Sequence, residues 1–120
     1  MSSLLNYMTS LPNYLRSNRK HSSLSQEEVA FMLGIKGMDK GNKVSRDEHY
    51  SRIPTLESAL AYEAIYGKPI RELFAGLYER IARDVSSRAK FLSYRKTKLP
   101  DPKKSQTLSE LALRHYKSVA

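Results

Sequence analysis

The stretch of sequence that decides the fold is SQEEVAFMLGIKGMDKGNKVSRDEHYSRIP, residues 25–54. It begins with Ser25-Gln-Glu-Glu28, which has the spacing of a capping box: the serine hydroxyl accepts from the Glu28 N–H, and the Glu28 side chain reaches back to the serine N–H. Apolar residues then follow on one helical face, and Gly34 suits the left-handed position that ends a helix. These signals predict a short helix over residues 26–33.

The second half of the stretch predicts another short helix after an irregular turn. Gly37 and Gly41 oppose regular structure over residues 35–43. Asp39 is suited to cap a helix that starts near Lys40 and runs through Val44 to His49 or Tyr50, and the residue before Pro54 avoids the α region. Two short helices joined by a turn form a helix-turn-helix, in which the second helix lies in the DNA major groove.

The rest of the chain also reads as helices. A first helix is expected from Leu11 to His21, capped by Ser10. Thr55 caps a further helix that ends at Gly67, and Pro69 starts a short one. The inner stripe of the helix after Thr55 is expected to hold Leu56, Ala59, Leu60 and Ile65. A long amphipathic helix follows from Leu77 to Tyr94 or Lys96, with Gly76 as a possible kink. A linker over residues 99–104 and a short helix, Leu108–Tyr116, complete an all-α chain.

Composition and charge narrow the function classes. The chain has 120 residues, a formal charge of +9 and no cysteine. Seven Lys or Arg stand against one acid between residues 88 and 104, which favours nucleic acid or another polyanion as partner. No apolar run is long enough to span a bilayer, and the N-terminus lacks the features of a signal peptide, so we expect a cytoplasmic protein. The three histidines are scattered, and P-loop, GxSxG and HExxH motifs are absent, so we predict neither catalysis nor a metal or cofactor.

Residues 14–75 resemble the phage-repressor-like (Cro/CI, or XRE) helix-turn-helix family. The resemblance is carried by SQEEVAFMLGI, VSRDE and PTLESALAYEAIYGKPIRELF, in that order. Three features depart from the family pattern: about four extra residues between Gly34 and Val44, Asp47 in place of a large residue, and Tyr50 in place of glycine. The resemblance implies a five-helix repressor-like domain over residues 11–75, an amphipathic basic helix over 76–98, and a linker with a short helix over 99–120.

The expected DNA contacts follow from treating Val44 as the buried anchor of the second helix. The outward residues that suit base edges are then Asn42, Lys43, Ser45 and Arg46. Residues expected to contact phosphates are Gln26, Lys36, Lys40, His49 and Arg52. Gln26 is also the position at which the family commonly has a phosphate-binding glutamine. A plain alternative is that Arg46 pairs with Asp47, Glu48 or Glu57 on the surface.

The long helix is expected to mediate dimerisation, through Leu77, Tyr78, Ile81, Val85 and Leu92. This gives a sequence-specific double-stranded-DNA-binding transcriptional regulator, a homodimeric repressor that acts by occupying its operator. Two other hypotheses stay open. An antitoxin would use the segment beyond about Leu99 to bind a toxin, and an interaction module would have lost DNA binding. The second alternative draws on the lengthened turn and on Asp47 and Glu48, because acids that face the groove repel phosphate.

Overall fold

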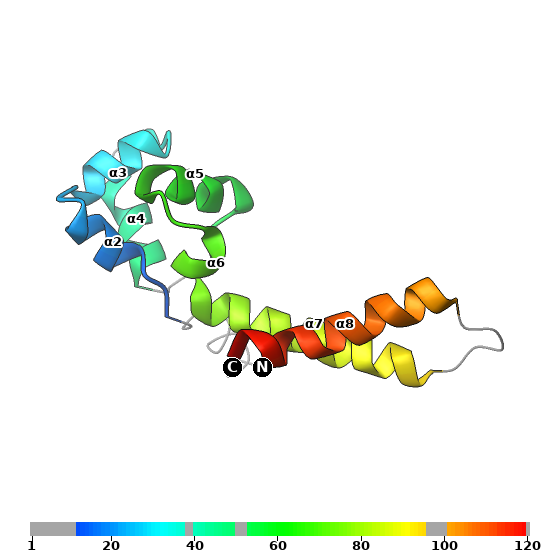
Figure 1. The fold of residues 1–120 in the computed structure, drawn as a ribbon. Coiled ribbons are helices and arrows are strands. Elements are labelled where there is room, and N and C mark those ends of the chain that lie inside the picture. The colour runs from blue at the N-terminus through cyan, green and yellow to red at the C-terminus, as the bar shows by residue number, and fades with distance from the viewer. Residues whose placement is uncertain (1–11, 38–39, 50–52, 96–100, 120) are drawn as a thin grey trace. The chain divides into compact units, whose positions relative to one another are not determined.

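The computed structural model describes residues 12–37, 40–49, 53–95 and 101–119, with the backbone alone at residues 40 and 115–119. Every regular element in these ranges is an α-helix, so the all-α prediction is confirmed for them. The chain divides into two compact units, residues 1–77 and 78–120. The helices are α2 (Leu15–His21), α3 (Gln26–Met32), α4 (Lys40–Glu48), α5 (Leu56–Tyr66), α6 (Ile70–Leu73), α7 (Ala75–Tyr94) and α8 (Pro102–Val119) (Figure 1).

The start of α3 forms as the sequence predicts. The Glu28 N–H donates to Ser25 Oγ at 3.0 Å, and the Ser25 N–H donates to Glu28 Oε1 at 2.8 Å, which completes the capping box. After the helix, Gly34 has φ +80°, a left-handed conformation that costs glycine little. The side chains of Val29 and Ala30 between these ends are fully buried. Local chemistry therefore defines both ends of α3, and its apolar face packs into the core.

The ends of α5 also match the prediction. Thr55 Oγ1 accepts a hydrogen bond from the Ser58 N–H at 3.2 Å. At the other end Gly67 adopts φ +67°, and its N–H donates to the Glu63 carbonyl. These two residues fix the length of α5 and turn the chain toward α6.

The core of the first unit gathers side chains from all of its described helices. Tyr62 lies at its centre, with its ring stacked on Tyr66 at 6.1 Å and edge-on to Phe74 at 6.5 Å between centroids. The Tyr14 N–H donates to the Leu73 carbonyl at 2.8 Å, which ties the start of α2 to the end of α6. The buried apolar residues are Leu15, Val29, Ala30, Val44, Ala59, Tyr62, Leu73 and Phe74.

The predicted inner face of α5 is wrong in part. Leu56 and Leu60 are 72% and 52% exposed, whereas Ala59 is buried and Ile65 packs against the core. The apolar residues of α5 itself are distributed around the whole helix, so their spacing does not select one face. The Tyr62 side chain selects the inward face, because its ring fills the core and its hydroxyl donates to the buried Asp47 carboxylate.

Two predicted helix ends differ in the first unit. The first helix starts at Leu15 rather than Leu11, because Asn13 Oδ1 accepts from the Leu15 N–H at 3.0 Å after the non-helical Pro12; Ser10 and Leu11 lie outside the described residues. The long helix begins at Ala75 and continues through Gly76 without a break. A Cβ at Gly76 would lie 3.1 Å from the Pro12 carbonyl oxygen, so this glycine allows a close approach of the two segments.

In the second unit, α8 is longer than the predicted Leu108–Tyr116. It spans 18 residues from Pro102, because Asp101 Oδ1 accepts from the Lys103 N–H at 3.0 Å and proline suits the first helical position. Ser86 Oγ of α7 donates to the Leu111 carbonyl of α8 at 2.9 Å, and Ala89 is buried. These contacts join α7 and α8, which lie side by side (Figure 1).

Candidate nucleic-acid interface

The inward face of α4 is formed by Val44 and by the residues three and four positions after it. Val44 is fully buried, as the sequence register requires, and Asp47 and Glu48 are 1% and 3% exposed. Residues three and four positions apart share a helix face, so both carboxylates lie on the side of Val44. The expectation that these two acids face a groove is therefore wrong. The interaction-module hypothesis loses the acidic face on which it drew.

Glu48 is the acceptor at the centre of a buried polar cluster. Arg19 donates to it twice, from Nε to Oε2 at 2.6 Å and from Nη2 to Oε1 at 3.2 Å. Gln26 Nε2 donates to Oε1 at 3.1 Å. Arg19 also donates from Nη1 to the Leu24 carbonyl at 3.1 Å, and the hydrogen bond to Glu48 raises the pKa of the guanidinium. This cluster fixes α4 to both α2 and α3.

Asp47 holds the same inward face of α4 against α5 and the segment before α2. The Tyr62 hydroxyl of α5 donates to Asp47 Oδ2 at 2.8 Å, and Asn13 Nδ2 donates to the Asp47 carbonyl at 2.9 Å. Burial raises the pKa of Tyr62, and the negative charge of Asp47 raises it further. The phenol therefore stays a donor. Together the two acids hold α4 at a set orientation in the unit.

The outward face of α4 carries cationic and neutral polar groups. Asn42, Arg46 and His49 are exposed, four and then three residues apart, while Lys43 and Ser45 are half-buried. His49 Nδ1 lies 2.7 Å from the Ser45 carbonyl oxygen, so this nitrogen carries the proton and donates. An amide, a guanidinium and an ammonium are the groups that pair with base edges in the major groove.

The residues expected to bind phosphates are only partly brought together. Lys36 is exposed in the turn between α3 and α4, and His49 is exposed one residue past the end of α4. Gln26 is half-buried and one N–H of its amide donates to Glu48, so its contact with phosphate stays a prediction. The side chain of Lys40 and the whole of Arg52 lie outside the described residues.

Helices α3 and α4 approach each other closely where α4 begins. A Cβ at Gly41 would lie 3.7 Å from Glu27 Cγ and 3.9 Å from Gln26 Cβ, which is ordinary van der Waals contact. The start of α4 at Lys40 agrees with the prediction, although Asp39, its expected cap, lies outside the described residues. The long turn thus delivers α4 directly against the first turn of α3.

The stripe expected to mediate dimerisation is divided between two environments. Leu77 is half-buried and packs against the core of the first unit, so it contributes to the fold, and its part in dimerisation stays a prediction. Tyr78, Ile81, Val85 and Leu92 of α7 are each exposed by 42–47%. We call these four residues the α7 stripe; it lies in the second unit.

The buried acids are the site feature that the sequence reasoning missed. The sequence contains a signal for their burial, because Asp47 and Glu48 stand three and four residues after the buried anchor Val44. Their partners Arg19 and Tyr62 had no such signal, since they lie on other helices.

Two structural absences bear on the site. Within the described ranges, no group of three or more His, Asp or Glu side chains is arranged to hold a metal ion. None of the described helices combines the length and apolar character that a membrane crossing requires.

Comparison with protein-family models, with curated proteins and with solved structures finds no match to this chain.

Proposed function

We propose that the chain is a sequence-specific double-stranded-DNA-binding transcriptional regulator, with a five-helix repressor-like domain in which α3 and α4 form the helix-turn-helix. The observation that carries this proposal is the sorting of charge on α4. Both carboxylates of the helix are buried against Arg19 and Tyr62, while Asn42 and Arg46 are exposed. The side of α4 that faces solvent therefore has no acid to repel DNA.

In this function α4 enters the major groove. Arg46 and Lys43 pair with guanine edges, Asn42 pairs with adenine, and Ser45 accepts or donates to either. Lys36 and His49 contact phosphates on the flanks. The formal charge of +9 supplies a sequence-independent attraction, so affinity falls steeply as salt is raised.

The regulator acts as a homodimer on two half-sites. Dimers of such proteins place their reading helices one helical turn of DNA apart, about 34–36 Å. The α7 stripe offers a self-association surface, because four large apolar or aromatic side chains on it remain exposed. Occupancy of an operator that overlaps a promoter would exclude polymerase and so repress transcription. In this function the protein is cytoplasmic and needs no small-molecule ligand.

The first test is selection of bound sequences from a random duplex pool with the full-length protein. We expect a short motif with two-fold symmetry. Recovery of no enriched motif, together with a flat dependence of affinity on salt, would contradict the proposal.

The second test assigns the reading face. Replacing Asn42, Lys43 or Arg46 by Ala should each cost about 1–3 kcal/mol in binding to the selected site and relax the preference at one base position. Lys36→Ala is the matched control: it should weaken binding to all sequences alike and leave the preference unchanged. If Arg46→Ala leaves both affinity and preference intact, α4 is not the reading helix.

A further inference from the structure

One side of α5 exposes apolar groups that the core of the unit does not use. Leu56, Leu60 and Ala64 follow one another at four-residue steps, so they lie along one side of the helix. Leu56 and Leu60 are 72% and 52% exposed, and Ala64 is exposed as well. We call these three residues the α5 stripe. Exposed apolar surface that is contiguous in this way is typical of interaction sites.

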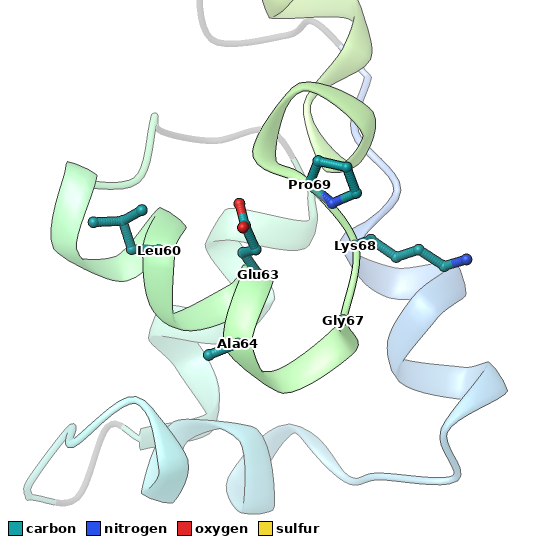
Figure 2. Close-up of a pocket in the computed structure, with 6 residues that line it drawn as sticks. All are labelled: Leu60, Glu63, Ala64, Gly67, Lys68 and Pro69. Atoms are coloured by element: carbon teal, nitrogen blue, oxygen red, sulfur yellow. The ribbon is translucent and has the colours of Figure 1, made fainter.

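The far end of the same side is hollow. A depression of about 480 Å³ lies where α5 turns into α6, lined by Leu60, Glu63, Ala64, Gly67, Lys68 and Pro69 (Figure 2). Ala64 and Gly67 contribute little or no side chain. The Glu63 carboxylate is engaged by the Ile70 N–H at 3.0 Å. The α5 side therefore has a projecting leucine at one end and a shallow apolar hollow at the other.

We infer that the α5 stripe is a docking surface for a second copy of this chain, in addition to the α7 stripe, with the two α5 helices antiparallel. Each residue advances a helix by about 1.5 Å, so Leu56 and Ala64 lie about 6 Å to either side of Leu60. If Leu60 of one copy rests on Ala64 of the second, Leu56 reaches the hollow at Gly67 and Lys68 of that copy. The two-fold axis repeats both contacts, so the surface is complementary to itself.

Charge supports the antiparallel direction over the parallel one. Glu57 is exposed at the start of α5 and Lys68 is exposed just after its end. Antiparallel pairing brings Glu57 of each copy near Lys68 of the other, twice in the dimer. Parallel pairing would place like charges together, which is unfavourable.

This contact deepens the proposed function and rests on it for its biological meaning. The α5 stripe belongs to the same compact unit as α4, residues 1–77, whereas the α7 stripe belongs to residues 78–120. A contact within the first unit ties the two reading helices to each other directly. It would therefore set the spacing of the half-sites.

The principal test is sedimentation of the full-length protein carrying Leu56→Arg. Burying a leucine is worth about 1.5–3 kcal/mol, and symmetry counts each change twice, so the dissociation constant of self-association should rise roughly 100-fold or more. Phe31→Arg is the matched control, because Phe31 is 76% exposed on α3, outside the α5 stripe. It should leave the constant unchanged. An equal constant for Leu56→Arg and wild type would overturn the inference.

A charge swap tests the direction of pairing without altering the apolar surface. Glu57→Lys and Lys68→Glu alone should each weaken self-association roughly threefold to tenfold, and the double variant should recover it. Failure of the double variant to recover would overturn the antiparallel arrangement. Because the chain has no cysteine, Ala64→Cys also provides a single site that a short bis-maleimide should link between copies.

Binding to the selected duplex separates this inference from the proposed function. If the wild type binds the duplex while Leu56→Arg self-associates normally, only the α5 inference fails. If self-association depends on Leu56 and the wild type selects no duplex, the α5 contact stands and the proposed function fails.

Discussion

Replacing Glu48 by glutamine should strongly destabilise the first unit. The Glu48 side chain is fully buried, and its carboxylate accepts three hydrogen bonds, two from Arg19 and one from Gln26. Glutamine keeps the size of the side chain but replaces one acceptor oxygen by an NH₂ donor, which then faces other donors. The substitution therefore tests charge and hydrogen bonding with little change in volume.

The magnitude follows from these contacts. A hydrogen bond to a charged group contributes about 1.5–3 kcal/mol, and removal of one partner from a buried ion pair costs about 3–5 kcal/mol. The Arg19 side chain is 12% exposed and also donates to the Leu24 carbonyl, so part of its charge stays solvated. We expect a loss near the lower bound, about 3 kcal/mol. Since domains are stable by only about 5–15 kcal/mol, this is a large fraction.

Urea unfolding followed by circular dichroism at neutral pH measures the effect. Glu72→Gln is the matched control, because it makes the same chemical change at an exposed position of the same unit and should cost about 0.5 kcal/mol or less. A double variant, Arg19→Met with Glu48→Met, should be more stable than Glu48→Gln, since no unpaired charge is left inside. Equal free energies of unfolding for Glu48→Gln and Glu72→Gln would refute the reasoning.

Three further predictions concern glycines and tyrosines. Gly41→Ala should raise the free energy of unfolding by about 0.5–1 kcal/mol, since its Cβ meets only ordinary contacts in α4, whereas Gly67→Ala at φ +67° should lower it by about 1 kcal/mol; thermal melts of the pair compare the signs. Tyr62→Phe should cost about 1–3 kcal/mol in urea unfolding, because it removes the donor to Asp47. Burial, together with the nearby Glu48 charge, raises the pKa of Tyr66 from 10.0 to about 12. Above pH 10 the unfolded chain therefore loses this proton first, and the free energy of unfolding falls by up to about 1.4 kcal/mol per pH unit. Tyr66→Phe should remove the Tyr66 share of that fall, while the share of Tyr62, whose pKa is also raised, remains. Stability at pH 7 should stay nearly unchanged, because the Tyr66 hydroxyl is buried without a hydrogen-bond partner among the described residues.

Features that depend on neighbours in sequence could be predicted. The capping box at Ser25, the left-handed Gly34 and the ends of α5 at Thr55 and Gly67 each involve atoms within about four residues. Their geometry is set by the backbone conformation of one turn. The sequence contains all the groups that take part, so pattern and outcome agree.

Features that depend on distant helices could not be predicted in this way. The side of α5 that turns inward was decided by Tyr62 and its partner Asp47, which lie 15 residues apart in the sequence. The amide of Gln26 was expected on phosphate because it stands at a helix start, but the Glu48 carboxylate 22 residues later lies within its reach. Periodicity describes one helix, whereas these outcomes depend on the pairing of several.

The buried and the exposed side chains of α4 differ in how freely they can be substituted: the buried ones hold the fold together, and the exposed ones do not. Val44, Asp47 and Glu48 are bonded or packed to other helices, whereas Asn42 and Arg46 are exposed on the other side of α4. A relative of this protein could change the second group and retain the first without unfolding. If α4 reads DNA, target preference can diverge on an unchanged scaffold, and the same positions are those to randomise when the protein is redirected to a new sequence.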